Sequence, residues 1–130
     1  MGDSTATTRQ AAPSEVKHVH WDKIPLEKMN SLLDRQLVVG SDVMVARVLL
    51  KKGCVIPLHS HHNEQVTMIE SGALQFTIDS KDIVVRSGEV LCIPPHVPHS
   101  ATALEDTVDI DIFTPPRQDW LDKTDQYLRG

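Results

Sequence analysis

The chain has 130 residues, of which 40% are apolar but only 4% aromatic, and its formal net charge is -5. This length fits one domain, and a core with so few aromatic rings has to be built mainly from Val, Ile, Leu and Met packed between strands. The negative charge and the lack of a Lys/Arg cluster exclude nucleic acid as an expected partner. Because no run approaches the roughly 20 apolar residues that span a bilayer, we expect a cytoplasmic protein without membrane contact.

The N-terminal third is the least regular part of the sequence. Residues 1–15 are too poor in large apolar groups to offset ordering entropy, which predicts a flexible tail before a single domain at 16–130. Residues 17–24 alternate in part and are expected to form an edge strand. Residues 25–37 indicate a short helix, with apolar positions at Leu26, Met29, Leu32 and Leu33.

Short β-rich segments then follow one another to residue 116. They cover residues 43–53, 54–61, 64–72, 73–80, 82–90, 91–99 and 106–116. Glycines and prolines separate them, which is typical of an all-β sandwich or barrel. The C-terminal residues 117–130 carry Trp120, Leu121, Tyr127 and Leu128 at roughly helical spacing, so we expect a short helix that closes one end of the barrel.

The two cysteines, Cys54 and Cys92, lie in different strand candidates and lack the paired spacing of a zinc ribbon or redox site. We interpret both as buried apolar residues rather than as a disulfide or a catalytic thiol.

Histidines suggest a metal site. If one strand continues through residues 59–65, His59, His61 and Gln65 point to the same side of it. The Pro94–Pro95 pair ends a later strand and brings His99 back toward the sheet as a fourth ligand. We expect His96, His18 and His20 to be exposed instead. Three imidazoles and one amide oxygen suit one divalent Ni, Fe, Mn, Co or Zn ion about equally.

Two stretches around these residues resemble the cupin motifs. Residues 53–72, GCVIPLHSHHNEQVTMIESG, resemble the first motif, and residues 88–99, GEVLCIPPHVPH, resemble the second. The resemblance covers about residues 37–115 and implies a double-stranded β-helix, or jelly-roll barrel, which binds metal through the four residues above. Small cupins generally pair, so it also implies a homodimer. Gln65, His96 and Ala103 depart from the usual Glu, Gly and Asn, and a cupin without metal stays an alternative.

The strand at 106–116 has an unusual face. Val108, Ile110 and Ile112 share one side, a candidate dimer surface, while Asp109, Asp111 and Phe113 share the other. Two acids and a Phe fit a ligand cavity, which combines apolar walls with a few polar groups. The alternative is an edge strand whose acidic face is solvated, with Phe113 under the C-terminal tail.

Asp111, Phe113 and Arg117, written D-x-F-x3-R, resemble the pectin-degradation proteins of the cupin superfamily. Those enzymes open the ring of 4,5-unsaturated monouronates. The resemblance implies that Asp111 moves the proton, Phe113 packs against the sugar ring and Arg117 pairs with its carboxylate; alternatively, Arg117 only caps the C-terminal segment.

The sequence therefore leads to a metal-dependent, isomerase-like or lyase-like enzyme that acts on a small anionic sugar. Two alternatives stay open. One is an iron-dependent cupin dioxygenase, which Gln65 does not exclude. The other is a metal- or sugar-binding cupin without turnover.

Overall fold

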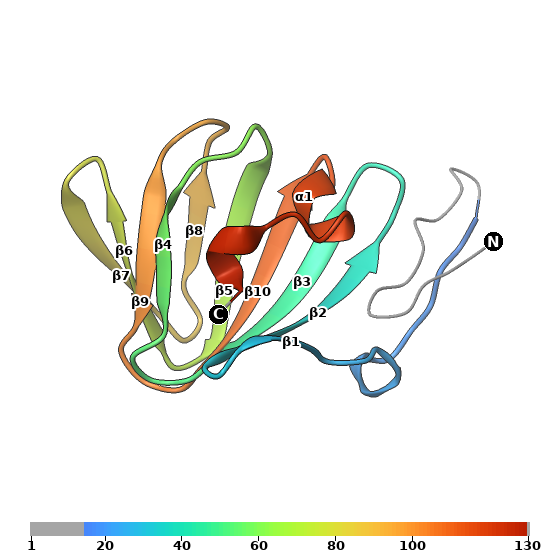
Figure 1. Ribbon diagram of the computed structural model, residues 1–130, viewed down its shortest axis with the longest axis horizontal. Helices are drawn as coiled ribbons and strands as arrows, with labels where there is room; N and C mark the ends of the chain where they lie inside the picture. Colours follow the sequence, from blue (N-terminus) through green and yellow to red (C-terminus); the bar gives the residue numbers. More distant parts are fainter. Residues whose placement is uncertain (1–14, 130) are drawn as a thin grey trace.

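The computed structural model describes residues 15–129 and consists of two antiparallel β-sheets packed face to face (Figure 1). The strand order is β1-β2-β3-β10-β5-β8 in one sheet and β4-β9-β6-β7 in the other. From β3 to β10 the chain passes back and forth between the two sheets, as in a jelly-roll barrel, which confirms the all-β prediction. Residues 1–14 of the predicted flexible tail lie outside the described residues. The strands are β1 (Glu27–Asn30), β2 (Leu33–Val39), β3 (Met44–Leu50), β4 (Val55–His59), β5 (Glu64–Ser71), β6 (Ala73–Ile78), β7 (Lys81–Arg86), β8 (Val90–Ile93), β9 (His99–Ala103) and β10 (Thr107–Thr114).

The core fills the space between the sheets, because each long strand buries every second side chain. In β3 the buried residues are Met44, Ala46, Val48 and Leu50. β10 lies between β3 and β5 and alternates in the same way, so its polar Asp109 and Asp111 face inward. The inward direction of these acids is the feature of the fold that matters most for the site.

Three predictions about local structure are wrong. Residues 17–24 contain a 3-10 helix at Trp21–Lys23 and no edge strand. The predicted helix at 25–37 is instead the antiparallel pair β1 and β2. Pairing with β3 decides this region, since a strand partner outweighs weak helical spacing. Cys54 is buried as expected, but Cys92 is exposed, on the outer side of β8; both are free thiols.

The C-terminal segment confirms the predicted short helical element. It contains α1 (Gln118–Leu121) and a 3-10 helix at Gln126–Leu128 that packs against β4, and it crosses in front of the strands in Figure 1. Arg35 of β2, in the six-stranded sheet, also holds the C-terminal segment, because its Nη1 donates to Asp125 at 2.6 Å. The Nε of Arg35 donates to Glu27 of β1 at 2.9 Å. The segment thus spans both sheets at one end of the sandwich. Within residues 15–129, no helix is long and apolar enough to cross a membrane.

Candidate metal centre and adjoining cavity

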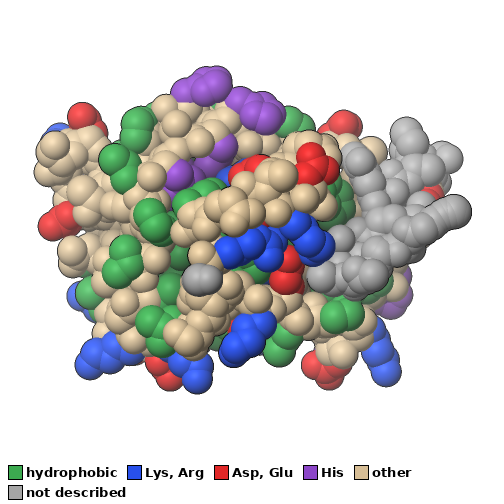
Figure 2. All heavy atoms as spheres, viewed as in Figure 1, with side chains coloured by type: hydrophobic (Ala, Val, Ile, Leu, Met, Phe, Trp, Pro, Cys, Tyr) green, Lys and Arg blue, Asp and Glu red, His purple; other side chains and the backbone are tan. Residues whose placement is uncertain are grey.

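Three histidines meet at the end of the sandwich that the C-terminal segment covers. His59 is the last residue of β4 and pairs with His99, the first residue of β9, while His61 lies in the loop before β5. One nitrogen from each ring lies within 4.8 Å of the other two, a group that can hold a metal ion. In Figure 2 histidine side chains gather at the top of the molecule, above the C-terminal segment.

The predicted ligands come together, but not in the predicted way. The strand does not continue from residue 59 to residue 65: β4 ends at His59 in the four-stranded sheet, and Gln65 belongs to β5 in the six-stranded sheet. The expectation based on strand parity is therefore wrong. The loop 60–63 carries the chain from one sheet to the other. His59 and Gln65 therefore approach the site from opposite sheets. His61 Nε2 lies 3.1 Å from Gln65 Oε1.

Backbone carbonyl groups orient all three rings. His59 Nδ1 lies 2.7 Å from the Pro57 oxygen, His61 Nδ1 3.0 Å from that of Asn63, and His99 Nδ1 2.8 Å from that of Val97. A ring that donates from Nδ1 presents a lone pair at Nε2, which is how metal-binding histidines are usually held. Nε2 of His99 is fully buried and has no hydrogen-bond partner among the described residues, so a metal ion would satisfy it.

The Gln65 amide gives a second reason to expect a cation. Gln65 Nε2 donates to Thr67 Oγ1 at 2.9 Å, and that hydroxyl donates its proton to Asp111 Oδ1 at 2.7 Å. This chain turns Gln65 Oε1 toward His61 Nε2. A neutral His61 ring has one N–H, whereas both of its partners, the Asn63 carbonyl oxygen and Gln65 Oε1, can only accept. With the ring proton on Nδ1, the lone pairs of Nε2 and Gln65 Oε1 face each other, which is unfavourable until a positive ion lies between them. The residues present therefore fit a metal ion.

The histidines are neutral near pH 7. Burial lowers the pKa of His59 and of His61 to about 4, and it also lowers the pKa of His99. Metal ligands have to be unprotonated, so the rings are ready to bind without releasing protons. An ion held by three imidazoles and an amide keeps its full charge of +2 and would act as a Lewis acid toward ligand oxygens.

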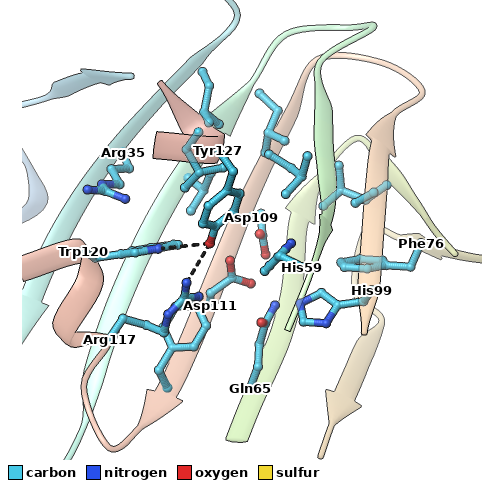
Figure 3. Close-up of a pocket in the computed structure, with 18 residues that line it drawn as sticks. Arg35, His59, Gln65, Phe76, His99, Asp109, Asp111, Arg117, Trp120 and Tyr127 are labelled. Carbon is cyan, nitrogen blue, oxygen red and sulfur yellow. Dashed lines mark hydrogen bonds between the residues drawn. The ribbon is translucent and has the colours of Figure 1, made fainter. Parts of the chain in front are cut away.

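A cavity of about 50 Å³ opens beside the histidines, between the two sheets. His59, Gln65 and His99 form part of its wall, and Asp109 and Asp111 point into it from β10 (Figure 3). Both carboxyl groups are buried, at 3% and 7% exposure, so the alternative of a solvated acidic strand face is wrong. Apolar side chains make up most of the remaining wall: Leu33, Val48, Leu50, Ile56, Leu74, Phe76 and Ala101.

Phe113 and Arg117 line the same cavity. The Phe113 ring packs edge-on against His61, with 5.7 Å between ring centroids, and the Arg117 guanidinium lies 5.1 Å from the Phe113 centroid. Arg117 is already engaged: Nε and Nη2 donate to the Asp119 carboxylate, and Nη2 also donates to Tyr127 Oη at 2.6 Å. Within residues 15–129 no hydrogen bond uses Nη1, which leaves that group for a ligand.

Sequence reasoning missed three residues that support the site. Thr67 joins Gln65 to Asp111, as described above. Asn63 is 2% exposed and donates to the carbonyl oxygens of Pro115 and Pro116, so it ties the His61 loop to the end of β10. Tyr127 stacks on His59, with 4.7 Å between the rings. Strand alternation could have found Thr67, whereas nothing in the sequence places Tyr127 beside His59.

The remaining four histidines do not belong to the converging group, although the His96 backbone N–H donates to the His61 carbonyl oxygen at 2.7 Å. His96, His18 and His20 are exposed, as predicted, and so is His62.

Comparisons with known proteins agree on the fold. The family model described as "Cupin domain" matches residues 46–113, more than half of the chain. An RmlC-like cupin from Shewanella frigidimarina is 25% identical, with 82% of this chain and 96% of that chain covered at a TM-score of 0.76. KdgF from Halomonas sp. is 27% identical, with 76% and 94% covered at a TM-score of 0.71. No curated protein matches.

A conserved protein of unknown function from Streptococcus pyogenes is 21% identical, with 88% of this chain and 99% of that chain covered at a TM-score of 0.63. This lower similarity shows the fold alone. The matched residues 46–113 contain all four predicted metal ligands and both inward acids. The jelly-roll topology, the three converging histidines and the family model point to the same conclusion: the chain belongs to the cupin family.

Proposed function

We propose that this cupin is a metal-dependent enzyme that opens the ring of 4,5-unsaturated monouronates. The observation that carries the proposal is the position of Asp111, a buried carboxyl group in the same cavity as His59, Gln65 and His99. The likeness to KdgF, a pectin-degradation protein, supports the same substrate class. When bound, the metal ion would polarise oxygens of the sugar.

Asp111 is suited to move the proton that the reaction requires. Its carboxylate takes the proton of the anomeric hydroxyl, the bond between the anomeric carbon and the ring oxygen breaks, and the electron pair goes to the ring oxygen, which becomes an enolate. Asp111 then returns the proton to the vinylic carbon, and a ketone forms. Substrate and product are isomers, so no co-reactant is needed. Burial raises the pKa of Asp111. Hydrogen bonds from Asp109 and Thr67 and the positive charge of Arg117 oppose this rise. A moderately raised pKa suits a group that first takes a proton and then returns it.

Arg117 and Phe113 would hold the substrate. The free Nη1 of Arg117 is a donor for the uronate carboxylate, and the Phe113 ring offers an apolar surface to the sugar. The cavity of about 50 Å³ is small for a sugar acid, because Arg117, Trp120, Tyr127 and Leu128 of the C-terminal segment cover it. Substrate entry therefore requires this segment to move outward.

The direct test follows the ultraviolet band of an unsaturated monouronate. Metal-free protein is loaded with Ni, Fe, Mn, Co or Zn, and decay of the band is compared with the uncatalysed rate. Asp111→Asn should lower kcat by about 100-fold or more while metal content stays unchanged, because a positioned acid and base contributes on the order of 10² to 10⁴ in rate. Asp42→Asn, at an exposed aspartate between β2 and β3, is the matched control.

The same assay separates the other functions. An equal rate without oxygen excludes a dioxygenase, whereas oxygen consumption that matches substrate loss would replace our proposal with that one. If no metal gives decay above the uncatalysed rate, the enzyme assignment is wrong, and a binding function without turnover takes its place.

The outer face of the six-stranded sheet supports a homodimer. Val108, Ile110 and Ile112 lie there at the centre of the sheet, next to Val66 and Met68 of β5. A partly exposed apolar face of this kind favours association with a second copy. The two free thiols support a reducing, cytoplasmic compartment.

A further inference from the structure

Asp109 is a buried acid that the proposed chemistry does not use. It lies on the inner face of β10, and its neighbours across the sheet are Val48 of β3 and Ile69 of β5, both apolar. Its Oδ1 atom is fully buried and has no hydrogen-bond partner among the described residues. An ionised carboxylate left in this state would be costly, so the position requires either a counter-charge or a proton.

The neighbouring carboxyl group, Asp111, decides which member of the pair holds the proton. Both carboxyl groups point into the cavity in Figure 3, and a proton on one of them would form a hydrogen bond to the other. Asp111 also accepts from Thr67 at 2.7 Å and feels the positive charge of Arg117. Asp109 has neither aid: burial and the charge of Asp111 raise its pKa well above the usual range. The negative charge therefore belongs on Asp111 and the proton on Asp109.

We propose that Asp109 is a positioning residue, which stays protonated at neutral pH and donates a hydrogen bond to the Asp111 carboxylate. Together with Thr67, it holds Asp111 from two sides and fixes the direction in which that carboxylate faces the cavity. Asp109 itself needs no contact with the substrate. For turnover, this inference rests on the function proposed above; the protonation of Asp109 does not.

The other charged and titratable groups that line the cavity, beside Asp111, are Arg35, His59, His99, Arg117 and Tyr127. None of them donates to Oδ1 of Asp109, so within the described residues only the proton satisfies this atom. When Asp109 ionises at alkaline pH, it stops donating and repels Asp111, and the arrangement is lost.

The first test needs no substrate. The infrared spectrum of the Zn²⁺-loaded protein at pH 7 should contain a band of a protonated carboxylic acid, and that band should be missing in Asp109→Asn. A wild-type spectrum without the band, or a band that persists unchanged in the variant, overturns the inference.

Thermal stability gives a second readout. The raised pKa of Asp109 means that the unfolded chain loses a proton there that the folded chain keeps, so the contribution of Asp109 to wild-type stability falls as pH rises above the unfolded value of about 4. Asp109→Asn lacks this penalty. Its Tm should exceed the wild-type Tm by a margin that widens from pH 5 to pH 8, whereas a constant margin contradicts a protonated Asp109.

Turnover of the unsaturated monouronate tests the positioning role. Asp109→Val removes the donor and should lower kcat by about 10- to 100-fold with little change in KM, the loss expected for a hydrogen bond to a charged group. Asp109→Asn restores a donor and should recover most of that loss. Equal kcat values for Asp109→Val and the wild type reject the role. If the wild type shows no turnover, the proposed function fails while the infrared result still decides the protonation.

Discussion

His99→Ala should abolish most of the metal-dependent stability of this protein. His99 is 2% exposed, and its Nε2 has no hydrogen-bond partner among the described residues. Loss of one ligand should weaken metal binding by at least about 100-fold, since even loss of a residue that only orients a ligand costs about 10- to 100-fold. With free metal at about 100 times the wild-type Kd, binding stabilises the wild type by about 2.7 kcal/mol. Most of this, about 2 kcal/mol, should disappear in the variant.

The assay combines elemental analysis with thermal unfolding. For a chain of this size, about 2 kcal/mol corresponds to a Tm shift of about 8 °C. Added Zn²⁺ should therefore raise the Tm of the wild type by about 8 °C more than it raises the Tm of His99→Ala. His96→Ala is the matched control, because His96 is an exposed histidine three residues away in the same turn.

Two outcomes would refute the reasoning. If His99→Ala retains one ion per chain and the full Tm response, His99 is no ligand. If His96→Ala loses the response as fully as His99→Ala does, the effect comes from the turn and not from a coordinating nitrogen.

Three further predictions follow from the site and the sheet. In metal-free protein the free energy of unfolding should fall as pH drops from about 6.5 to about 4, because the unfolded chain protonates His59 and His61 while the folded chain, with pKa values of about 4, does not; urea titrations at several pH values measure this fall, and a flat profile contradicts it. Gln65→Glu should bind metal more tightly, because it adds a negative ligand, but it should raise the KM for an anionic substrate, because it lowers the net positive charge of the metal site. Calorimetry measures the metal affinity and turnover measures the KM; an unchanged KM argues against recognition of the substrate by charge. Ile110→Asp should yield a monomer in light scattering, while Ile83→Asp on the edge strand β7 should not; a monomeric wild type at micromolar concentration would rule out the dimer.

The sequence by itself determined the all-β architecture from residue 43 onward and the three histidines that converge in a possible metal site. Alternating apolar residues between glycines and prolines predict strands, since a strand buries every second side chain, and the same alternation predicts that Asp109 and Asp111 share a face with Phe113. The structure brings His59, His61 and His99 together as a group that can hold a metal ion, although the strand path assumed between residues 59 and 65 is wrong.

Only the tertiary structure decided how these residues meet. Gln65 faces His61 because the loop 60–63 passes from one sheet to the other, which strand parity along a single strand cannot describe. Tyr127 lies on His59, although 68 positions separate them in the numbering, because the C-terminal segment crosses the end of the sandwich. The helix expected at 25–37 became two strands for the same reason: pairing with β3 is a long-range interaction, and it outweighs the local spacing of four apolar side chains.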